Sequence, residues 1–134
     1  MSCLYLLDTN IISELVKHPQ GLIFHKIQQI GESQVCTSIV VAAELKFGVK
    51  NKNSSKLAEK LAIILEAIDI LPFRTPADNH YAEIRHYLKI RGTPIGANDL
   101  LIAAHALSLN STLVTANVRE FSRIPDLRVE NWLK

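Results

Sequence analysis

Three of the thirteen acidic residues stand in apolar stretches of the sequence, where a charged side chain is costly unless it has a partner. Asp8 directly follows the apolar run of residues 3–7, and Asp99 opens the apolar segment LLIAAHAL (100–107). Around Glu44, the positions three and four residues away on either side hold Val40, Val41, Phe47 and Gly48. Carboxylates in such surroundings are candidates for binding a ligand or a metal ion.

Each of these acids also has a purely structural explanation. Asp8 could cap the helix expected directly after it, because Asp is favoured at that position. Asp99 could lie in the first turn of a helix, where a negative charge typically contributes about 0.3–1 kcal/mol. Glu44 could form a salt bridge with a lysine such as Lys46 or Lys50. These alternatives stay open at the level of sequence.

Asn117 adds an amide oxygen to the set. It follows the predicted strand 112–115 by two residues, although Asn is also common in turns. Ligands of parallel sheets bind beyond the carboxyl ends of the strands, and Asp8 falls there too. Three carboxylates and one amide at that edge would form an all-oxygen pocket, which favours Mg²⁺ or Mn²⁺ over zinc. Such an ion can hold the water that attacks a phosphodiester.

Short apolar runs alternate with amphipathic segments along the chain, which predicts a layered α/β fold with a mostly parallel sheet of four to five strands. The expected strands are residues 3–7, 35–38, 70–73, 112–115 and 128–131. The expected helices are residues 10–17, 22–30, 39–49, 55–67, 77–90 and 99–109, with Ser38 as the N-cap of the third. The polar stretch KNKNSSK (50–56) is expected to be an exposed loop.

The composition narrows the class of protein. A chain of 134 residues with 48% hydrophobic residues and a net charge of +2 predicts one domain, residues 1–134, and excludes intrinsic disorder. Neither a membrane span nor a secretory signal is expected, which favours the cytoplasm. Cys3 and Cys36 do not make a disulfide framework, so we expect reduced thiols buried in strands. Among the histidines, His105 is expected to be a core residue.

Four segments, in this order, give the chain a resemblance to the PIN-domain family and, within it, to the VapC-type toxins of bacterial toxin–antitoxin modules. They are LLDTNIISEL (6–15), TSIVVAAELKFGV (37–49), GTPIGANDLLIAAHA (92–106) and TLVTANVREFSRIPDLRVENW (112–132). The resemblance covers essentially the whole chain. It implies a three-layer α/β/α PIN-like fold and endoribonuclease activity that depends on Mg²⁺ or Mn²⁺.

The resemblance also implies roles and partners. The metal ligands would be Asp8, Glu44 and Asp99. Thr9 and Thr115 would support the site, and Ser38 would either support it or only cap its helix. The substrate would be a structured RNA, with tRNA as one target class. A VapB-type antitoxin would restrain the toxin by inserting a C-terminal segment near the acids, and it alone would bind operator DNA. The toxin would be a homodimer.

One departure concerns Asn117, where many PIN domains carry a fourth acid. With one negative charge fewer, we expect one well-bound ion and a second only when the RNA phosphate arrives. Glu120 is a candidate substitute acid. Three basic residues close in sequence to these segments are candidates for contacts with RNA phosphates, namely Arg85, Lys89 and Arg119.

Two classes of phosphotransfer protein also have an Asp after the first strand, but this sequence lacks the other residues that they require. Haloacid-dehalogenase-type phosphatases need a second Asp two residues later, where this chain has Asn10. Response-regulator receivers need an Asp after the third strand, and residues 71–73 are Leu-Pro-Phe. The remaining alternative is a catalytically weak PIN-like module that binds RNA or a partner without cutting.

Overall fold

The computed structural model describes residues 3–134, which form a five-stranded parallel sheet with the strand order β3-β2-β1-β4-β5. The strands are β1 (Tyr5–Leu7), β2 (Val35–Ser38), β3 (Asp69–Leu71), β4 (Thr112–Val114) and β5 (Val129–Glu130). The predicted α/β class and parallel sheet are therefore confirmed. The central strand is β1, whose Leu6 and Leu7 are fully buried.

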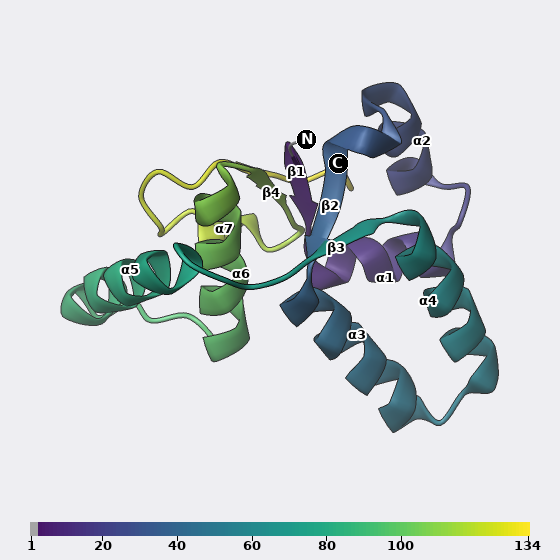
Figure 1. The fold of residues 1–134 in the computed structure, drawn as a ribbon, viewed down its shortest axis with the longest axis horizontal. Coiled ribbons are helices and arrows are strands. Elements are labelled where there is room, and N and C mark those ends of the chain that lie inside the picture. The colour runs from purple at the N-terminus through teal and green to yellow at the C-terminus, as the bar shows by residue number, and fades with distance from the viewer. Residues whose placement is uncertain (1–2) are drawn as a thin grey trace.

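Helices cover both sides of the sheet (Figure 1). In chain order they are α1 (Thr9–Lys17), α2 (Leu22–Ile30), α3 (Ile39–Lys52), α4 (Ser55–Ala67), α5 (Ala77–Arg91), α6 (Ala97–Leu109) and the short α7 (Val118–Phe121). In Figure 1, α1, α2 and α4 lie to the right of the strands and α5, α6 and α7 to the left. Helix α3 leaves the end of β2 and packs against both α1 and α6. This arrangement is the three-layer α/β/α fold that the sequence predicted.

The polar stretch 50–56 is mostly helical, so the expected loop there is wrong. Helix α3 continues to Lys52, and Asn53, in the left-handed conformation (φ 52°), ends it. Ser54 then caps α4 by accepting a hydrogen bond from the Leu57 N–H (3.2 Å). Two capping residues, Asn53 and Ser54, are therefore enough to connect α3 to α4. Ser38 caps α3 as predicted, accepting from the Val40 N–H (3.0 Å).

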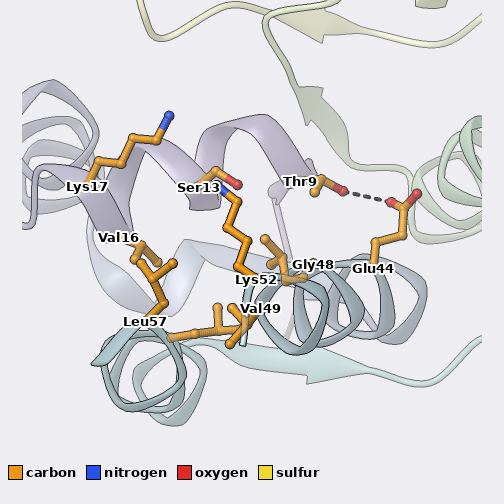
Figure 2. Close-up of a pocket in the computed structure, with 11 residues that line it drawn as sticks. Thr9, Ser13, Val16, Lys17, Glu44, Gly48, Val49, Lys52 and Leu57 are labelled. Atoms are coloured by element: carbon orange, nitrogen blue, oxygen red, sulfur yellow. Dashed lines mark hydrogen bonds between the residues drawn. The ribbon is translucent and has the colours of Figure 1, made fainter. Parts of the chain in front are cut away.

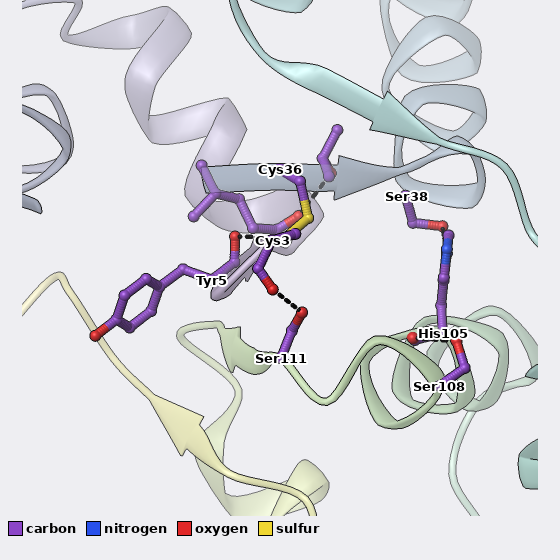
Figure 3. Close-up of a disulfide and its surroundings, with 9 residues drawn as sticks. Cys3, Tyr5, Cys36, Ser38, His105, Ser108 and Ser111 are labelled. Carbon is purple, nitrogen blue, oxygen red and sulfur yellow. Dashed lines mark hydrogen bonds between the residues drawn. A yellow bond between two sulfur atoms is a disulfide. The ribbon is translucent and has the colours of Figure 1, made fainter. Parts of the chain in front are cut away.

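The expectation of two reduced thiols is also not met, because Cys3 and Cys36 form a disulfide (Figure 3). Cys3 precedes β1 and Cys36 lies in the neighbouring strand β2, where it is opposite Leu6. Their Cα atoms are 5.6 Å apart, within the range that a disulfide spans. Two cysteines that are 33 residues apart in sequence meet because the strands pair in parallel.

The apolar core lies between the sheet and its helices. Its largest fully buried side chains include Phe121, Ile102 and Ile11, together with both leucines at the end of β1. His105 of α6 is buried among them (1% exposed), as expected for a core histidine. Within residues 3–134, none of the helices has the length and apolar character that crossing a membrane requires.

Candidate active site

Asp8 lies at the carboxyl end of β1, the central strand, and is 4% exposed. It caps α1, because its Oδ1 accepts a hydrogen bond from the Thr9 N–H (2.8 Å), and its Oδ2 accepts one from the Thr115 hydroxyl (2.8 Å). Burial raises the pKa of the Asp8 carboxyl above 3.8, the hydrogen bonds from Thr9 and Thr115 oppose that rise, and the charge of Glu44 adds to it. Asp8 is therefore both a helix cap and a desolvated acid at a strand end.

Glu44 approaches this edge from α3. Its Oε1 accepts from the Thr9 hydroxyl (2.8 Å) and its Oε2 from the Asn98 side-chain amide (2.9 Å). Figure 2 shows Thr9 and Glu44 facing each other across the space between α1 and α3. In the described part of the chain, Glu44 forms no ion pair with Lys46 or Lys50. Neutral donors therefore hold this carboxylate and leave its charge uncompensated.

Asp99 lies in the first turn of α6, and Glu120 of α7 faces it. The pKa of Asp99 is raised from 3.8 to about 8, first by burial, then by a hydrogen bond with the Glu120 side chain and by the negative charges of Glu120, Asp8 and Glu44. Oε1 of Glu120 is buried and has no hydrogen-bond partner among the described residues. Burial and the neighbouring negative charges therefore favour the protonated form of Asp99.

Asn117 joins the network through its backbone. Its N–H donates to Oγ1 of Thr115 (3.0 Å), while its side chain is exposed and makes no hydrogen bond within residues 3–134. Glu120, not Asn117, therefore brings a fourth carboxyl to Asp99. Ser38 makes no hydrogen bond with the acids within residues 3–134; its buried hydroxyl contacts His105 (2.8 Å) and accepts from the Val40 N–H at the start of α3 (3.0 Å).

The candidate RNA contacts occupy two places. Arg85 and Lys89 line a cavity of about 660 Å³ between α5 and the start of α6, which also includes Ala97 and Leu100 on either side of Asp99. Arg85 is oriented by a hydrogen bond from its Nη1 to the Tyr81 hydroxyl (2.8 Å). Arg119 is exposed on α7, next to Glu120. The basic side chains of α5 thus lie near the helix turn that carries Asp99.

Two contributors to the site were missed from sequence. Asn98 directly precedes Asp99 and holds Glu44. Asn10 donates to Oγ1 of Thr115 (3.3 Å) and accepts from the Ala116 N–H (3.0 Å), so it fastens α1 to the end of β4. Both lie in segments that carried the resemblance to the PIN-domain family, but neither was given a role in the site from sequence.

The donor set suits a hard divalent cation. As the side chains stand, no group of three acidic, histidine or cysteine side chains in the described part of the chain is close enough to hold an ion. The acids are nevertheless near enough to raise the pKa of Asp99, and they leave one buried oxygen of Glu120 without a partner. A cation would relieve both conditions, and carboxylate oxygens are ligands that Mg²⁺ and Mn²⁺ prefer.

Comparison with known proteins places this site in a family. The model of the PIN domain matches residues 5–127, which include all four acids. The chain belongs to the PIN-domain family.

Within that family the chain is similar to VapC ribonucleases. It is 41% identical over 134 residues to ribonuclease VapC2 of Rickettsia felis, covering 98% of this chain and 99% of that protein. It is 33% identical over 131 residues to the tRNA(fMet)-specific endonuclease VapC of Salmonella typhimurium, covering 96% of this chain and 97% of that protein. The crystal structure of VapBC2 from Rickettsia felis bound to a promoter DNA fragment contains a similar chain, with a TM-score of 0.90, 37% identity and coverage of 96% and 98%.

Proposed function

We propose that this protein is an endoribonuclease that uses Mg²⁺ or Mn²⁺ and acts as the toxin of a VapBC-like toxin–antitoxin module. The observation that carries the proposal is the convergence of Asp8, Glu44, Asp99 and Glu120 at one edge of the sheet. These acids come from four separate segments, and burial, followed by the charges of the other three acids, raises the pKa of Asp99 to about 8. A folded protein retains such an unfavourable cluster where a cation and a reaction need it. Similarity to named VapC ribonucleases supports the assignment.

The residues of the site would have two kinds of role, binding the cation and orienting the carboxylates that bind it. Asp8, Glu44 and Asp99 would hold the cation, which supplies an activated water and neutralises charge on the phosphodiester. Thr115 and Thr9 fix Asp8 and Glu44 through hydrogen bonds of 2.8 Å, so both carboxylates are oriented in advance. Asp99 would bind the cation as a carboxylate, so the cation would compete with the proton that its raised pKa favours. Glu120 remains in position to accept a proton or to contribute a further oxygen.

We propose a structured RNA as substrate, with tRNA as the first class to test. Arg85 and Lys89, in the cavity beside the start of α6, would contact phosphates on one side of the bond that is cut. Arg119 would do so from α7. The tRNA preference rests on one relative's name alone, the tRNA(fMet)-specific endonuclease of Salmonella typhimurium.

The partner we propose is a VapB-type antitoxin, as in the VapBC complex of Rickettsia felis. A cavity of about 180 Å³ runs from Thr9 and Glu44 between α1 and α3 towards α4. Figure 2 shows the side chains that line it. Its lining combines apolar residues such as Val16 and Leu57 with Lys17 and Lys52. An antitoxin segment in this cavity would end beside the acids. Operator DNA would be bound only through the antitoxin, and the toxin would act in the cytoplasm as a homodimer.

The test is cleavage of total tRNA by the purified protein with Mg²⁺ and with a chelator. Asp99→Asn is the inactivating variant, and Asp69→Asn, which alters an exposed acid of β3, is the matched control. Discrete fragments that require both the cation and Asp99 are expected. RNA binding without cleavage at any cation concentration would instead identify a PIN module that binds RNA and does not cut it.

A further inference from the structure

Helices α3 and α6 are joined beside the acids by Asn98. Its side-chain amide donates to Oε2 of Glu44 (2.9 Å), while the Thr9 hydroxyl donates to Oε1 (2.8 Å). Asn98 therefore determines which way the second oxygen of Glu44 points. It is exposed, so its hydrogen bond with Glu44 adds little to the core.

The same two helices are joined in the core by His105. Its Nδ1 lies 2.8 Å from the Ser38 hydroxyl, and both side chains are at most 1% exposed. The Ser38 oxygen already accepts from the Val40 N–H, so its hydroxyl hydrogen is free to be donated to His105. The His105 ring also hydrogen-bonds the backbone of Pro72, which offers only a carbonyl. The neutral ring with its proton on Nε2 satisfies both contacts, and burial, which lowers the pKa of His105, favours the neutral ring. Figure 3 shows Ser38 and His105 facing each other.

The spacing makes the two bonds act together. Asn98 and His105 are seven residues apart on α6, which is two turns, so they lie on one face of the helix. Their partners are the N-cap of α3 and a residue in its second turn. Two attachment points on the same pair of helices fix both their relative rotation and their relative translation. Because Asp99 follows Asn98 directly, the same bonds fix the distance between Asp99 and Glu44.

We propose that Asn98 and His105 are positioning residues, which set the Glu44 carboxylate relative to Asp99 and so shape the cation site. This inference rests on the proposed function. Both donors to Glu44 are neutral, so they orient the carboxylate and leave its charge available to the cation, which a lysine in their place would not. Outer-shell partners of this kind typically change metal affinity or activity by about 10–100-fold when removed.

The first experiment measures Mn²⁺ affinity by calorimetry for Asn98→Ala and for the control Asn79→Ala. Asn79 is also exposed and lies in the first turn of a helix, α5. We expect Asn98→Ala to bind Mn²⁺ about 10-fold or more weakly and to lower kcat with little change in KM for RNA, while Asn79→Ala matches the wild type. Asn98→Gln, which keeps the amide donor, should recover part of the loss. Wild-type affinity in Asn98→Ala would overturn the proposal.

A double-mutant cycle tests whether Asn98 acts through Glu44. In a Glu44→Gln background, Asn98→Ala should cause little further loss of Mn²⁺ affinity, whereas fully additive losses would contradict the mechanism. The failure of the proposed function looks different: the wild type would then bind Mn²⁺ and cut no RNA, and the affinity comparison would still be readable.

His105 is tested with His105→Gln, monitored by both urea unfolding and Mn²⁺ affinity. We expect weaker Mn²⁺ binding, and a combined loss with Asn98→Ala that is smaller than the sum of the two single losses, because both bonds fix the same helix pair. If His105→Gln unfolds more readily yet binds Mn²⁺ like the wild type, His105 only stabilises the core and the two-point proposal is wrong. If it does not fold, Ser38→Gly removes the same bond from the other side while keeping a residue that is tolerated as the N-cap of α3, and it is judged by the same two results.

Discussion

The two halves of the acidic site differ in how their carboxyls are satisfied. In the Asp8–Glu44 half, each of the four carboxylate oxygens accepts a hydrogen bond of 2.8–2.9 Å from a neutral group. In the Asp99–Glu120 half, the two carboxyls face each other, and Oε1 of Glu120 is buried without a partner within residues 3–134. The first half is organised by the fold itself. The second half needs either a proton or a cation.

This difference indicates how a protein can bring several carboxylates together without losing too much folding free energy. Hydroxyl and amide donors orient two carboxylates without neutralising them, which keeps their charge for a ligand. In the Asp99–Glu120 pair, the unfavourable burial and negative charges raise the pKa of Asp99 to about 8. Binding a cation would then convert the strained half into a satisfied one. Changes to the two halves should therefore have different signatures.

The largest effect is expected from Asp99→Asn, which removes a carboxyl from the strained half. Cleavage should fall by roughly 10²–10³-fold, because the cation would lose Asp99 as a ligand. The metal-free protein should nevertheless become more stable at neutral pH, because the unfolded chain no longer gains free energy by releasing the Asp99 proton, which burial and nearby acids retain in the folded state. RNA cleavage rates and urea unfolding with a chelator measure the two effects on the same samples. Equal loss of activity and of stability would show that the two halves do not differ.

Glu120→Gln is expected to have the next largest effect. It removes the charge that faces Asp99, so the pKa of Asp99 should fall from about 8 towards 3.8 in the metal-free protein. Cation affinity should fall by about 10-fold, because one nearby oxygen charge is gone. Carboxyl-detected NMR titration reports the pKa, and calorimetry reports the affinity. Asn117→Ala is the control in the same segment, and it should leave the pKa of Asp99 unchanged.

Thr115→Val should break the organised half. The substitution keeps the shape of the side chain and leaves Oδ2 of buried Asp8 without its donor, which typically costs about 1–3 kcal/mol of folding free energy. Here activity and metal-free stability should fall together, in contrast to Asp99→Asn. Thr112→Val, at the start of β4, is the comparison, because within residues 3–134 the Thr112 hydroxyl accepts only a long hydrogen bond from Arg128 (3.4 Å) and makes none with an acid. Urea unfolding that is unchanged in Thr115→Val would contradict the description of this half.

The last prediction concerns the pH dependence of metal-free stability. Folded Asp99 keeps its proton up to about pH 8, whereas the unfolded chain releases it near the ordinary value of 3.8. The folded state thus binds more protons across this window, and the stability contributed by Asp99 is lost as the pH rises through about 8. The free energy of unfolding in the presence of a chelator, measured at several pH values, should decline less in Asp99→Asn than in the wild type. Saturating Mg²⁺ should also reduce the decline in the wild type.

Local sequence chemistry predicted most of the fold. Helices such as Leu22–Ile30 and Ser55–Ala67 have the bounds that their apolar spacing indicated, and Ser38 caps α3 as its position suggested. The loop expected at residues 50–56 was wrong because two cap residues, Asn53 and Ser54, suffice to end one helix and begin the next. Polarity alone does not distinguish an exposed helix end from a loop.

The site was less predictable than the fold. The apolar surroundings singled out Asp8, Glu44 and Asp99, and similarity in order and spacing pointed to a PIN domain. Asn98 gave no such signal, because an exposed Asn at a helix start is common and its role depends on a residue 54 positions earlier. The disulfide between Cys3 and Cys36 likewise depends on the pairing of two strands.

By itself, the sequence determined the elements, the parallel α/β class and the acids that stand in apolar surroundings, because these properties depend on neighbours within a few residues. Tertiary structure alone decided which side chains meet: Glu120 with Asp99, Asn98 with Glu44, and Ser38 with His105. Such contacts join distant segments, and their geometry follows from how helices pack on a sheet. The sequence alone gives the position of each acid, whereas the pKa of Asp99 and the orientation of Glu44 depend on contacts between segments that only the fold brings together.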